Sequence, residues 1–389
     1  MSAIDVLLAG PLAAMTVGGV VFAGLGAACA RLWLGEQPPE VDARKLPPLT
    51  LLRPVKPGVP SLREKLETLA QAMRPGDQLV LGADEGSPEF AVCEAVRAVF
   101  LDREIVVAAC APGAAVNPKI AKLVQMDAHA RHEHLLLSDS EALIDGAWLD
   151  PFRSEWTASG ADVLTAPYRF VGFATTPQRV DAAAMLLSFW PGLALVRALG
   201  QVQFTLGACT GLRRADLAAV GGWAAFGEFL AEDNRLGAAL AERHARIRLS
   251  AQVATLESDP LNWRDFWRHQ RRVAVTWRVC DPRGFSGLIV TYGISASILM
   301  LLLAPMSASP AFWLLWAIAT LAGRWFTTWA LAKIVRMEIP DLWRALAVAG
   351  PAETACWVLS WRAPVIWWAG GERLVGADGR MSAVRSRST

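Results

Sequence analysis

The sequence predicts an α/β domain flanked by membrane-spanning helices. The chain has 389 residues, of which 53% are hydrophobic and 19% are charged, and its mean hydropathy is +0.32. Such a chain is too apolar for an ordinary soluble enzyme and far too apolar for a disordered protein. Long uncharged stretches lie towards both ends, whereas residues 48–255 alternate short apolar runs with amphipathic stretches. The first pattern is typical of membrane helices, and the second is typical of a largely parallel sheet covered by helices.

Charge and cysteine content exclude several other classes of protein. The formal net charge is +2, so the chain has no broad basic surface of the kind that binds nucleic acid, and we expect no nucleic-acid partner. The six cysteines contain no Cys-x-x-Cys pair, which argues against a zinc module and against a disulfide framework. A reducing, cytosolic environment fits this cysteine usage best.

Residues 1–35 are predicted to form the first transmembrane helix. No charged residue lies between Asp5 and Arg31, and this run exceeds the roughly 20 helical residues needed to cross a bilayer. A cleaved signal peptide is the alternative. No basic region precedes the apolar run, however, and the run is longer than the apolar part of a typical signal peptide. We therefore expect the helix to be retained.

The C-terminal third of the chain is predicted to return to the membrane. Residues 284–335 form a transmembrane helical hairpin in which Pro305 and Pro310 separate the two helices. Residues 344–371 fit a further span, a re-entrant segment or an interfacial segment, and the sequence leaves these three open. The basic tail, residues 372–389, is expected to hold the C-terminus at an anionic membrane surface.

An interfacial amphipathic helix is predicted at residues 261–283, directly before the hairpin. Twelve of the seventeen tryptophans follow residue 260, as expected of rings placed where hydrocarbon meets headgroups. Within residues 262–280, Trp263, Trp267 and Trp277 alternate with five arginines at helix-like spacing. Basic residues at this position and after the first helix place the middle region in the cytoplasm by the positive-inside rule. The protein is therefore expected to be a multi-pass integral membrane protein with a cytoplasmic catalytic domain.

Residues 48–260 are predicted to be that catalytic domain. The expected strands are Leu51–Val55, Gln78–Ala83, Glu104–Ala109, His134–Ser138 and Asp162–Pro167. The expected helices are Ser61–Met73, Pro88–Leu101 and Pro118–Ala130, each opened by a residue suited to a helix N-terminus. Residues 182–199 are apolar apart from Arg197, and they fit either a membrane-dipping element or a core helix of this domain.

Three acids stand at the ends of apolar runs, where open α/β sheets bind their ligands. Asp84 ends the run from Leu79, Asp139 ends the run from Leu135, and Asp233 opens a helical stretch. The chain has no Gly-x-Gly-x-x-Gly motif and no Walker loop, so neither of those motifs holds a nucleotide here. The acids are candidates for metal binding and for general base catalysis.

An ordered series of short motifs resembles that of ceramide glucosyltransferases and their bacterial relatives, the hopanoid-associated glycosyltransferases. The series comprises Asn117-Pro118-Lys119, Leu137-Ser138-Asp139-Ser140, Ala231-Glu232-Asp233 and Arg268-His269-Gln270-Arg271-Arg272. Supporting stretches are Leu52-Arg53-Pro54-Val55-Lys56-Pro57 and the run from Gly207 to Arg214. The likeness extends from about residue 48 to the end of the interfacial helix, and it is specific as a set rather than motif by motif.

The resemblance implies a GT-A nucleotide-diphospho-sugar transferase fold. It implies inverting transfer of a hexose, glucose or N-acetylglucosamine, from a UDP-sugar to the hydroxyl group of a membrane lipid. Ceramide is the first expected acceptor and a hopanoid the second. The resemblance also implies a divalent cation, Mg²⁺ or Mn²⁺, at the donor diphosphate.

The same resemblance implies a role for each site residue. Asp233 is the general base, and Arg268 and Arg271 neutralise the departing diphosphate. Asp139 holds the divalent metal, with Glu141 as a second ligand or with water completing the shell. Donor binding falls to the remaining matched positions, which are Pro54, Lys56, Asp84, Asn117, Lys119 and Arg272.

Two positions depart from the family pattern. The metal motif of this fold is often Asp-x-Asp, whereas this chain has Asp139-Ser140-Glu141, and Arg272 replaces the tryptophan that ends the arginine motif. Two other functions stay open. A processive polysaccharide synthase shares much of the motif set but needs more spans than three or four for a polymer channel. A catalytically inactive membrane-anchored binding protein is the non-enzyme alternative, which the altered tryptophan position keeps open.

Overall fold

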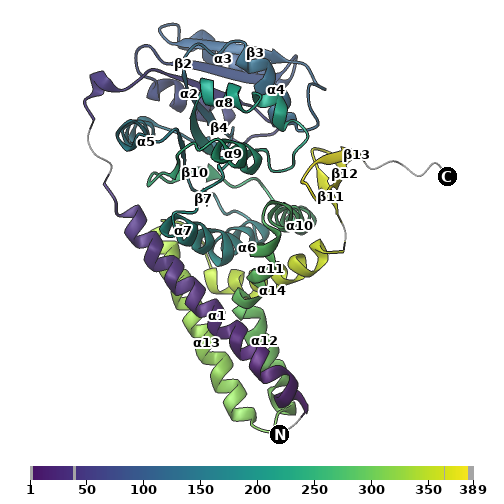
Figure 1. The fold of residues 1–389 in the computed structure, drawn as a ribbon. Helices are drawn as coiled ribbons and strands as arrows, with labels where there is room; N and C mark the ends of the chain where they lie inside the picture. Colours follow the sequence, from purple (N-terminus) through teal and green to yellow (C-terminus); the bar gives the residue numbers. More distant parts are fainter. Residues whose placement is uncertain (1–2, 38–40, 363, 384–389) are drawn as a thin grey trace, which may run out of the picture. The chain divides into compact units, whose positions relative to one another are not determined.

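The computed structural model describes residues 3–37, 41–362 and 364–383, and the chain divides into two compact units (Figure 1). The first, which we call the membrane domain, comprises Met1–Gly35, Phe173–Gly200 and Pro260–Leu374. The second, which we call the α/β domain, comprises Glu36–Gly172, Gln201–Asp259 and Val375–Thr389. Each domain is therefore assembled from segments that are distant in sequence.

A seven-stranded sheet of the described residues forms the centre of the α/β domain, in the order β3-β2-β1-β4-β8-β6-β9. Strands β1 to β4 are parallel, β8 runs antiparallel to both β4 and β6, and β9 is parallel to β6. Their bounds are β1 Leu49–Pro54, β2 Gln78–Asp84, β3 Glu104–Cys110, β4 His134–Ser138, β6 Val163–Thr165, β8 Cys209–Arg213 and β9 Ile247–Leu249. A small sheet pairs β10 (Ala254–Glu257) with β5 (Ala142–Leu143) and β7 (Tyr168–Val171).

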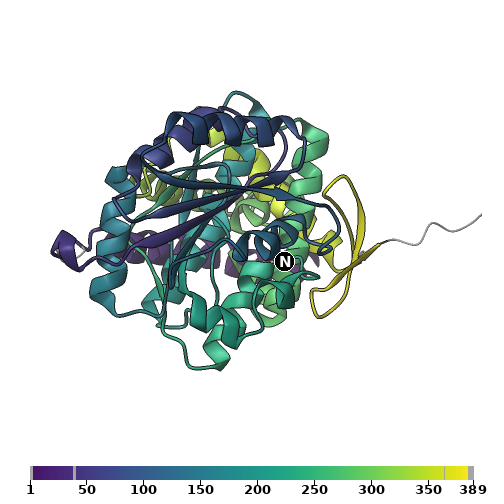
Figure 2. The same cartoon turned by 90° about the horizontal axis from the view of Figure 1, so that it is seen from above.

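Helices cover both faces of the main sheet, whose strands β1, β2 and β3 are drawn in blue in Figure 2. One apolar core lies under α2, α3 and α5, and a second lies under α4 and α9. The helices of this domain are α2 Leu62–Ala72, α3 Pro88–Val99, α4 Pro118–Asp127, α5 Gly146–Ser159, α8 Arg214–Ala219 and α9 Glu232–Glu242, with short turns η1 Ala43–Lys45 and η3 Trp223–Phe226. This mixed sheet between two helical layers is the predicted α/β architecture.

The five predicted strands and three predicted helices all form, with ends that differ by a few residues. Strand β4 has the predicted bounds because a run of three leucines is followed directly by a polar turn. Strand β8, which is not among the predicted strands, enters the sheet antiparallel between β4 and β6. Because β1, β2 and β4 are parallel, the residues that follow them lie at one edge of the sheet.

A buried ion pair between Asp77 and Arg153 ties the start of β2 to α5. The two side chains are 0% and 2% exposed, and both arginine terminal nitrogens donate to the carboxylate, at 2.9 and 2.6 Å. The backbone amides of Leu49 and Arg74 donate to the same carboxylate at 2.9 and 2.8 Å. Each of the two carboxylate oxygens of Asp77 therefore accepts two hydrogen bonds.

Asp77→Ala is expected to destabilise the protein by about 3–5 kcal/mol, because it leaves the Arg153 charge buried without a partner. Thermal unfolding of the full-length protein in detergent measures the change as a lowered Tm. Asp150→Ala is the matched control, since Asp150 pairs with Arg74 in an exposed ion pair whose expected contribution is at most about 1 kcal/mol. Equal Tm values for the two variants would contradict the prediction.

The membrane domain is built from helices that pack around α1 (Ala3–Leu34). Helix α1 packs against α7 (Trp190–Ala198), α12 (Gly293–Leu303) and α13 (Pro310–Ile334), and α14 (Leu342–Ser360) packs against α6 (Thr176–Ala184) and α10 (Trp263–Cys280). The remaining helical segments are α11 Pro282–Gly287, η4 Leu288–Thr291, η5 Ala304–Met306 and a single π-helical turn, η2 Met185–Phe189. A Cβ at Gly19 would lie 2.9 Å from the Cα of Gly293, so the small residues permit close helix packing.

By length and composition, two described helices can cross a membrane, Leu7–Leu34 and Thr176–Ala198. The pair Pro282–Thr291 and Gly293–Met306 is bent by 41° and adds a third span if it crosses as one. The first of these is the predicted N-terminal helix, and the bent pair is the first helix of the predicted hairpin. The predicted second helix of the hairpin, α13, has the required length but contains Arg324 and four tryptophans. It is not among the described helices that are both long enough and apolar enough to cross a membrane.

Two segments differ from the sequence expectation. Residues 173–200 interrupt the predicted catalytic stretch 48–260 and belong to the membrane domain, because their apolar helices pack against α1 rather than on the main sheet. Within the predicted membrane segment 344–371, the helix ends at Ser360. The strand β11 (Val365–Trp368) follows and pairs antiparallel with β12 (Gly371–Val375). A final strand, β13 (Met381–Ala383), lies in the predicted basic tail.

Candidate active site

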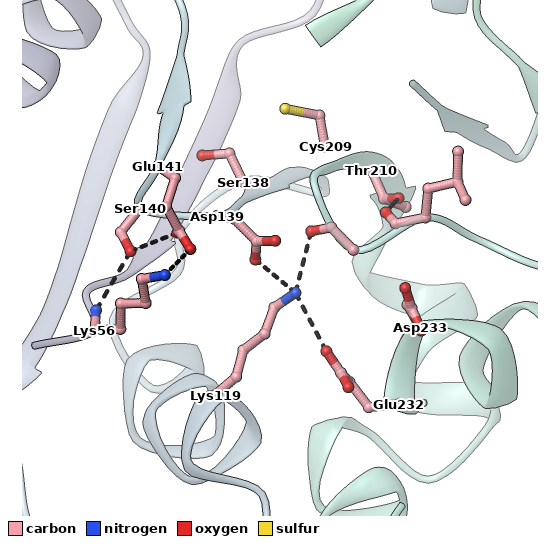
Figure 3. A network of polar contacts seen from close by, with 12 residues as sticks. Lys56, Lys119, Ser138, Asp139, Ser140, Glu141, Cys209, Thr210, Glu232 and Asp233 are labelled. Atoms are coloured by element: carbon pink, nitrogen blue, oxygen red, sulfur yellow. Dashed lines mark hydrogen bonds and ion pairs between the residues drawn. The ribbon is translucent and has the colours of Figure 1, made fainter. Parts of the chain in front are cut away.

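A cluster of charged side chains lies at the carboxyl edge of the main sheet, around the ammonium group of Lys119 (Figure 3). Lys119 extends from the first turn of α4, and its Nζ lies 2.7 Å from Oδ1 of Asp139 and 3.3 Å from Oε1 of Glu232. It also donates to the carbonyl oxygen of Gly207 at 3.1 Å. Asp139 follows β4 directly, and Glu232 begins α9. One lysine therefore joins the two predicted acidic motifs.

Gly207 lies where these groups converge. A Cβ at this position would lie 3.1 Å from Oδ2 of Asp233, 3.2 Å from Nζ of Lys119 and 3.7 Å from Oδ2 of Asp139. Lys119 and Asp233 line a small pocket in the α/β domain together with Gly207, Thr210 and Trp223. The missing side chain of Gly207 thus keeps space open between the predicted metal ligand and the predicted base.

Asp233 has the electrostatic character of a general base. Burial and the neighbouring carboxylate of Glu232 raise the pKa of Asp233 to about 7, and the charge of Lys119 opposes this rise. Burial alone would lower the pKa of Lys119, but the surrounding carboxylates outweigh it and raise that pKa, so the lysine stays charged. A carboxylate with a pKa near 7 is a far better proton acceptor than an exposed aspartate.

Turnover is expected to fall as the pH drops through about 7, because Asp233 must be ionised to accept a proton. Lys119→Met removes a charge that lowers the pKa of Asp233, so the acidic limb of the kcat profile should move to higher pH. Lys119→Arg, which keeps the charge, is the control. An acidic limb at the same pH in all three proteins would contradict the assignment.

Three further ion pairs involve the predicted donor-binding residues Lys56 and Asp84. The ammonium group of Lys56 pairs with Glu141 and lies 2.5 Å from Oδ2 of Asp259. Lys122 pairs with Asp84 at 3.0 Å and donates to the carbonyl oxygen of Val55. Asp84, at the end of β2, is half-exposed. Pro54 is buried as the last residue of β1, so Lys56 and Asp84 are the accessible members of this part of the edge.

Asn117 has a structural role in addition to any contact with donor. It is fully buried and caps α4, because its Oδ1 accepts from the amides of Lys119 and Ile120. Its Nδ2 donates to Oε2 of Glu232 at 3.0 Å and to the carbonyl oxygen of Phe229. Asn117 therefore fixes the lysine on one side and the start of α9 on the other.

Arg53 and Gly207 contribute to the site without having been assigned a role from the sequence. Arg53 is fully buried and donates to Oγ of Ser138 at 3.1 Å, while its two terminal nitrogens have no hydrogen-bond partner among the described residues. Burial lowers its pKa to about 10, with Cys209, Glu141 and Asp139 acting in the opposite direction. An arginine inside an otherwise apolar strand is the sequence feature that marks this position.

The predicted diphosphate-binding arginines lie on α10, in the membrane domain. Arg268 lies 4.3 Å from the centre of the Trp367 ring, and Arg272 contacts the His269 ring at 3.0 Å. Arg271 lies on the same helix. The structure thus gives α10 the predicted amphipathic character, with Trp263 and Trp267 exposed. The contribution of these arginines to donor binding stays a prediction.

The chemistry of the α/β edge fits a hard divalent cation held mainly by the donor. Carboxylate oxygens are the ligands that Mg²⁺ and Mn²⁺ prefer, and such ions often take one or two protein carboxylates together with phosphate oxygens. Asp139 supplies such a carboxylate, whereas Glu141 is paired with Lys56 and points toward that lysine. In the described part of the chain, no group of three or more His, Cys, Asp or Glu residues is arranged to hold a metal by itself.

Comparison with known proteins places these observations in a family. The model of glycosyl transferase family 21 matches residues 12–381. This match includes the main sheet, α10 and the strands β11 and β12, and the motif series lies within it. Similar solved structures include the mannosyltransferase PcManGT from Pyrobaculum calidifontis in complex with GDP-Man and Mn²⁺. It has a TM-score of 0.53 at 16% identity, covering 90% of this chain and 99% of that one.

Two further structures match with lower TM-scores. TarS residues 1–349 from S. aureus, in complex with UDP-GlcNAc, has a TM-score of 0.39 at 14% identity and covers 84% of this chain and 96% of that one. A second structure is glucosyl-3-phosphoglycerate synthase from Mycobacterium tuberculosis, in complex with Mn²⁺, UDP and glucosyl-3-phosphoglycerate. It has a TM-score of 0.37 at 15% identity, and the match covers 62% of this chain and 85% of that one. The first match confirms the predicted GT-A-like fold.

Proposed function

The chain belongs to glycosyl transferase family 21, the ceramide glucosyltransferase family, and from this we propose that it transfers a hexose from a UDP-sugar to the hydroxyl group of a membrane lipid. Ceramide is the proposed acceptor, and glucose or N-acetylglucosamine is the proposed sugar. The observation that carries the proposal is the convergence of Asp139, Lys119 and Asp233 on the space beside Gly207.

The proposed reaction needs a base for the acceptor. A lipid hydroxyl is a poor nucleophile near neutral pH, so a carboxylate must take its proton as the new bond forms. Asp233 meets this requirement because its raised pKa lets it accept a proton near pH 7. The acceptor oxygen then attacks the anomeric carbon, the bond to the UDP oxygen breaks, and the sugar is transferred with inversion.

The leaving group needs positive charge. We propose that Asp139 holds a Mg²⁺ or Mn²⁺ ion, which supplies charge neutralisation to the donor diphosphate when bound. Lys119 lies beside this carboxylate and adds a fixed positive charge. Arg268, Arg271 and Arg272 are the proposed second source of charge, since guanidinium groups bind phosphate oxygens in a bidentate manner. Asp84 is the proposed contact for the nucleoside.

Membrane attachment supports a lipid acceptor. Helix Leu7–Leu34 and helix Thr176–Ala198 meet the length and hydropathy requirements of a span, and α10 exposes tryptophans and arginines as an interfacial helix does. We propose a multi-pass protein with the α/β domain in the cytoplasm, because basic residues follow the first span and precede α11. A lipid substrate is then available in the same membrane.

The test is UDP release by the full-length, detergent-purified protein. A panel of UDP-sugars is combined with ceramide, a hopanoid or diacylglycerol, and Asp233→Asn serves as the inactive control. Ceramide-stimulated release with one sugar supports the proposal. If only another lipid stimulates UDP release, that lipid and not ceramide is the acceptor. UDP binding without release in any combination contradicts the enzymatic proposal and favours an inactive binding protein.

A further inference from the structure

The end of the chain folds back onto the α/β domain beside the proposed base. Residues 375–383, which we call the C-terminal clamp, belong to this domain although all of residues 260–374 belong to the membrane domain. The clamp lies against residues 227–231, which directly precede Glu232 and Asp233 and which we call the base loop. The sequence predicts instead that this basic segment binds a membrane surface.

Backbone hydrogen bonds join the two segments. The amide of Met381 donates to the carbonyl oxygen of Glu228 at 2.7 Å, and the amide of Leu230 donates to the carbonyl oxygen of Gly379 at 3.1 Å. Phe229 and Arg380 form an isolated antiparallel bridge. Gly379 has a φ of +84°, a conformation that side chains rarely adopt, so the tight turn at this point requires glycine.

Side chains reinforce the contact. Arg380 forms an ion pair with Glu228, and its guanidinium lies 4.9 Å from the centre of the Phe229 ring. Arg235, on the first turns of α9, donates to the carbonyl oxygen of Asp378 at 2.6 Å. Met381 is 4% exposed. The clamp therefore contacts both the base loop and the helix that carries the base.

The opposite side of the base loop is held by Asn117. Its backbone amide donates to the carbonyl oxygen of Gly227 at 2.8 Å, and its side chain donates to Phe229 and Glu232. Helix α9 has Ala231 at its N-cap and receives no side-chain capping hydrogen bond. With no cap of its own, the first turn of α9 is held by these two flanking contacts and by Thr205, whose Oγ1 donates to the carbonyl oxygen of Asp233 at 2.7 Å.

We propose that the C-terminal clamp is a positioning element for catalysis: by holding the base loop against Asn117, it fixes the carboxylate of Asp233 toward the pocket beside Gly207. This inference rests on the proposed role of Asp233 as the base. The clamp residues themselves touch no reacting group. Loss of the clamp is expected to act on the proton transfer and to leave donor binding to the sheet edge unchanged.

Arg380→Glu in the full-length protein tests the clamp, because it places a negative charge against Glu228. A tenfold to hundredfold fall in kcat is expected, since a displacement of about 1 Å can cost that much, with UDP-sugar Kd within twofold of wild type. Greater exposure of Asp233 should also move the acidic limb of the kcat profile to lower pH. Arg373→Glu is the matched control, because it changes the charge by the same amount at a residue that precedes the clamp. The exchange Glu228→Arg with Arg380→Glu should restore part of the lost kcat.

A truncation pair provides a second test. A stop after Leu374 removes the clamp, whereas a stop after Ala383 retains it. Hydrogen exchange of the backbone amides in residues 227–235 should accelerate at least tenfold in the first protein and in Arg380→Glu, but not in the second or in Arg373→Glu. Unchanged exchange and an unchanged kcat profile in Arg380→Glu would overturn the inference.

The two proposals fail in different ways. If wild-type protein releases no UDP with any acceptor, the proposed function fails, and the exchange measurement still decides whether the clamp fixes the base loop. If wild type is active but Arg380→Glu keeps its kcat and its acidic limb, the positioning role of the clamp is overturned and the proposed function stands.

Discussion

Asp233→Asn is expected to abolish sugar transfer while leaving the affinity for UDP-sugar within about twofold of wild type. Asparagine has the size of aspartate but accepts no proton near neutral pH, and general base catalysis contributes about 10²- to 10⁴-fold to rate. Removing the carboxylate also removes a negative charge next to Lys119, which keeps its contacts with Asp139 and Glu232. The nucleotide-binding edge should therefore stay assembled.

The measurement separates binding from chemistry. UDP-sugar Kd is obtained by titration calorimetry, and kcat by UDP release with saturating acceptor. Glu232→Gln is the control, because it alters the neighbouring acid without removing the base. Glu232→Gln should retain more activity than Asp233→Asn and should move the acidic limb to lower pH, since the Glu232 charge raises the pKa of Asp233. Full activity of Asp233→Asn would remove Asp233 from the role of base.

The sequence predicted the strands and the acids that follow them because those features depend on local patterns. Apolar runs such as Leu135–Leu137 form strands when they are buried, and the polar residue that ends each run lies at the edge of the sheet. Parallel pairing of β1, β2 and β4 then brings these edges together. The fold class and the location of the candidate site follow from these patterns.

The interactions of Lys119 did not follow from local patterns. The lysine contacts Asp139 and Glu232, which are 20 and 113 positions further along the chain, and only the tertiary fold brings them within ion-pair distance. Arg380 shows the same limit. In the sequence it is one of several basic residues near the C-terminus, whereas in the structure it pairs with Glu228. Periodicity gives the face on which a residue lies but not its partner.

Residues 173–200 show a different limit. Their apolar character fits a core helix and a membrane helix equally well, because both bury the same kinds of side chain. The structure assigns them to the membrane domain, where Arg324 of α13 donates to the carbonyl oxygen of Leu187 at 2.7 Å within the π-helical turn. This polar contact joins two apolar segments, and no periodic pattern in the sequence encodes it.

Asp139→Ala is expected to weaken metal-dependent binding of UDP-sugar by about 10- to 100-fold, since an interaction with a charged group contributes about 1.5–3 kcal/mol. The substitution removes the carboxylate proposed to hold the cation and leaves Lys119 paired with Glu232 alone. UDP-sugar Kd is measured with Mn²⁺ and with chelator, in the variant and in wild type. Asp150→Ala, an exposed acid of the same domain, is the control.

The affinity for UDP-sugar with Mn²⁺ and with chelator shows whether a loss of affinity in Asp139→Ala comes from loss of the cation. If Asp139 binds the cation, wild type should bind UDP-sugar more tightly with Mn²⁺ than with chelator, and Asp139→Ala should bind equally in both. If wild-type affinity is the same in both conditions, Asp139 is not a metal ligand, and Lys119 with the buried Arg53 becomes the source of charge for the diphosphate. Nζ of Lys119 lies 2.7 Å from Oδ1 of Asp139, so the lysine and the cation compete for this carboxylate. Lys119→Met should therefore bind Mn²⁺ more tightly than wild type in the absence of nucleotide.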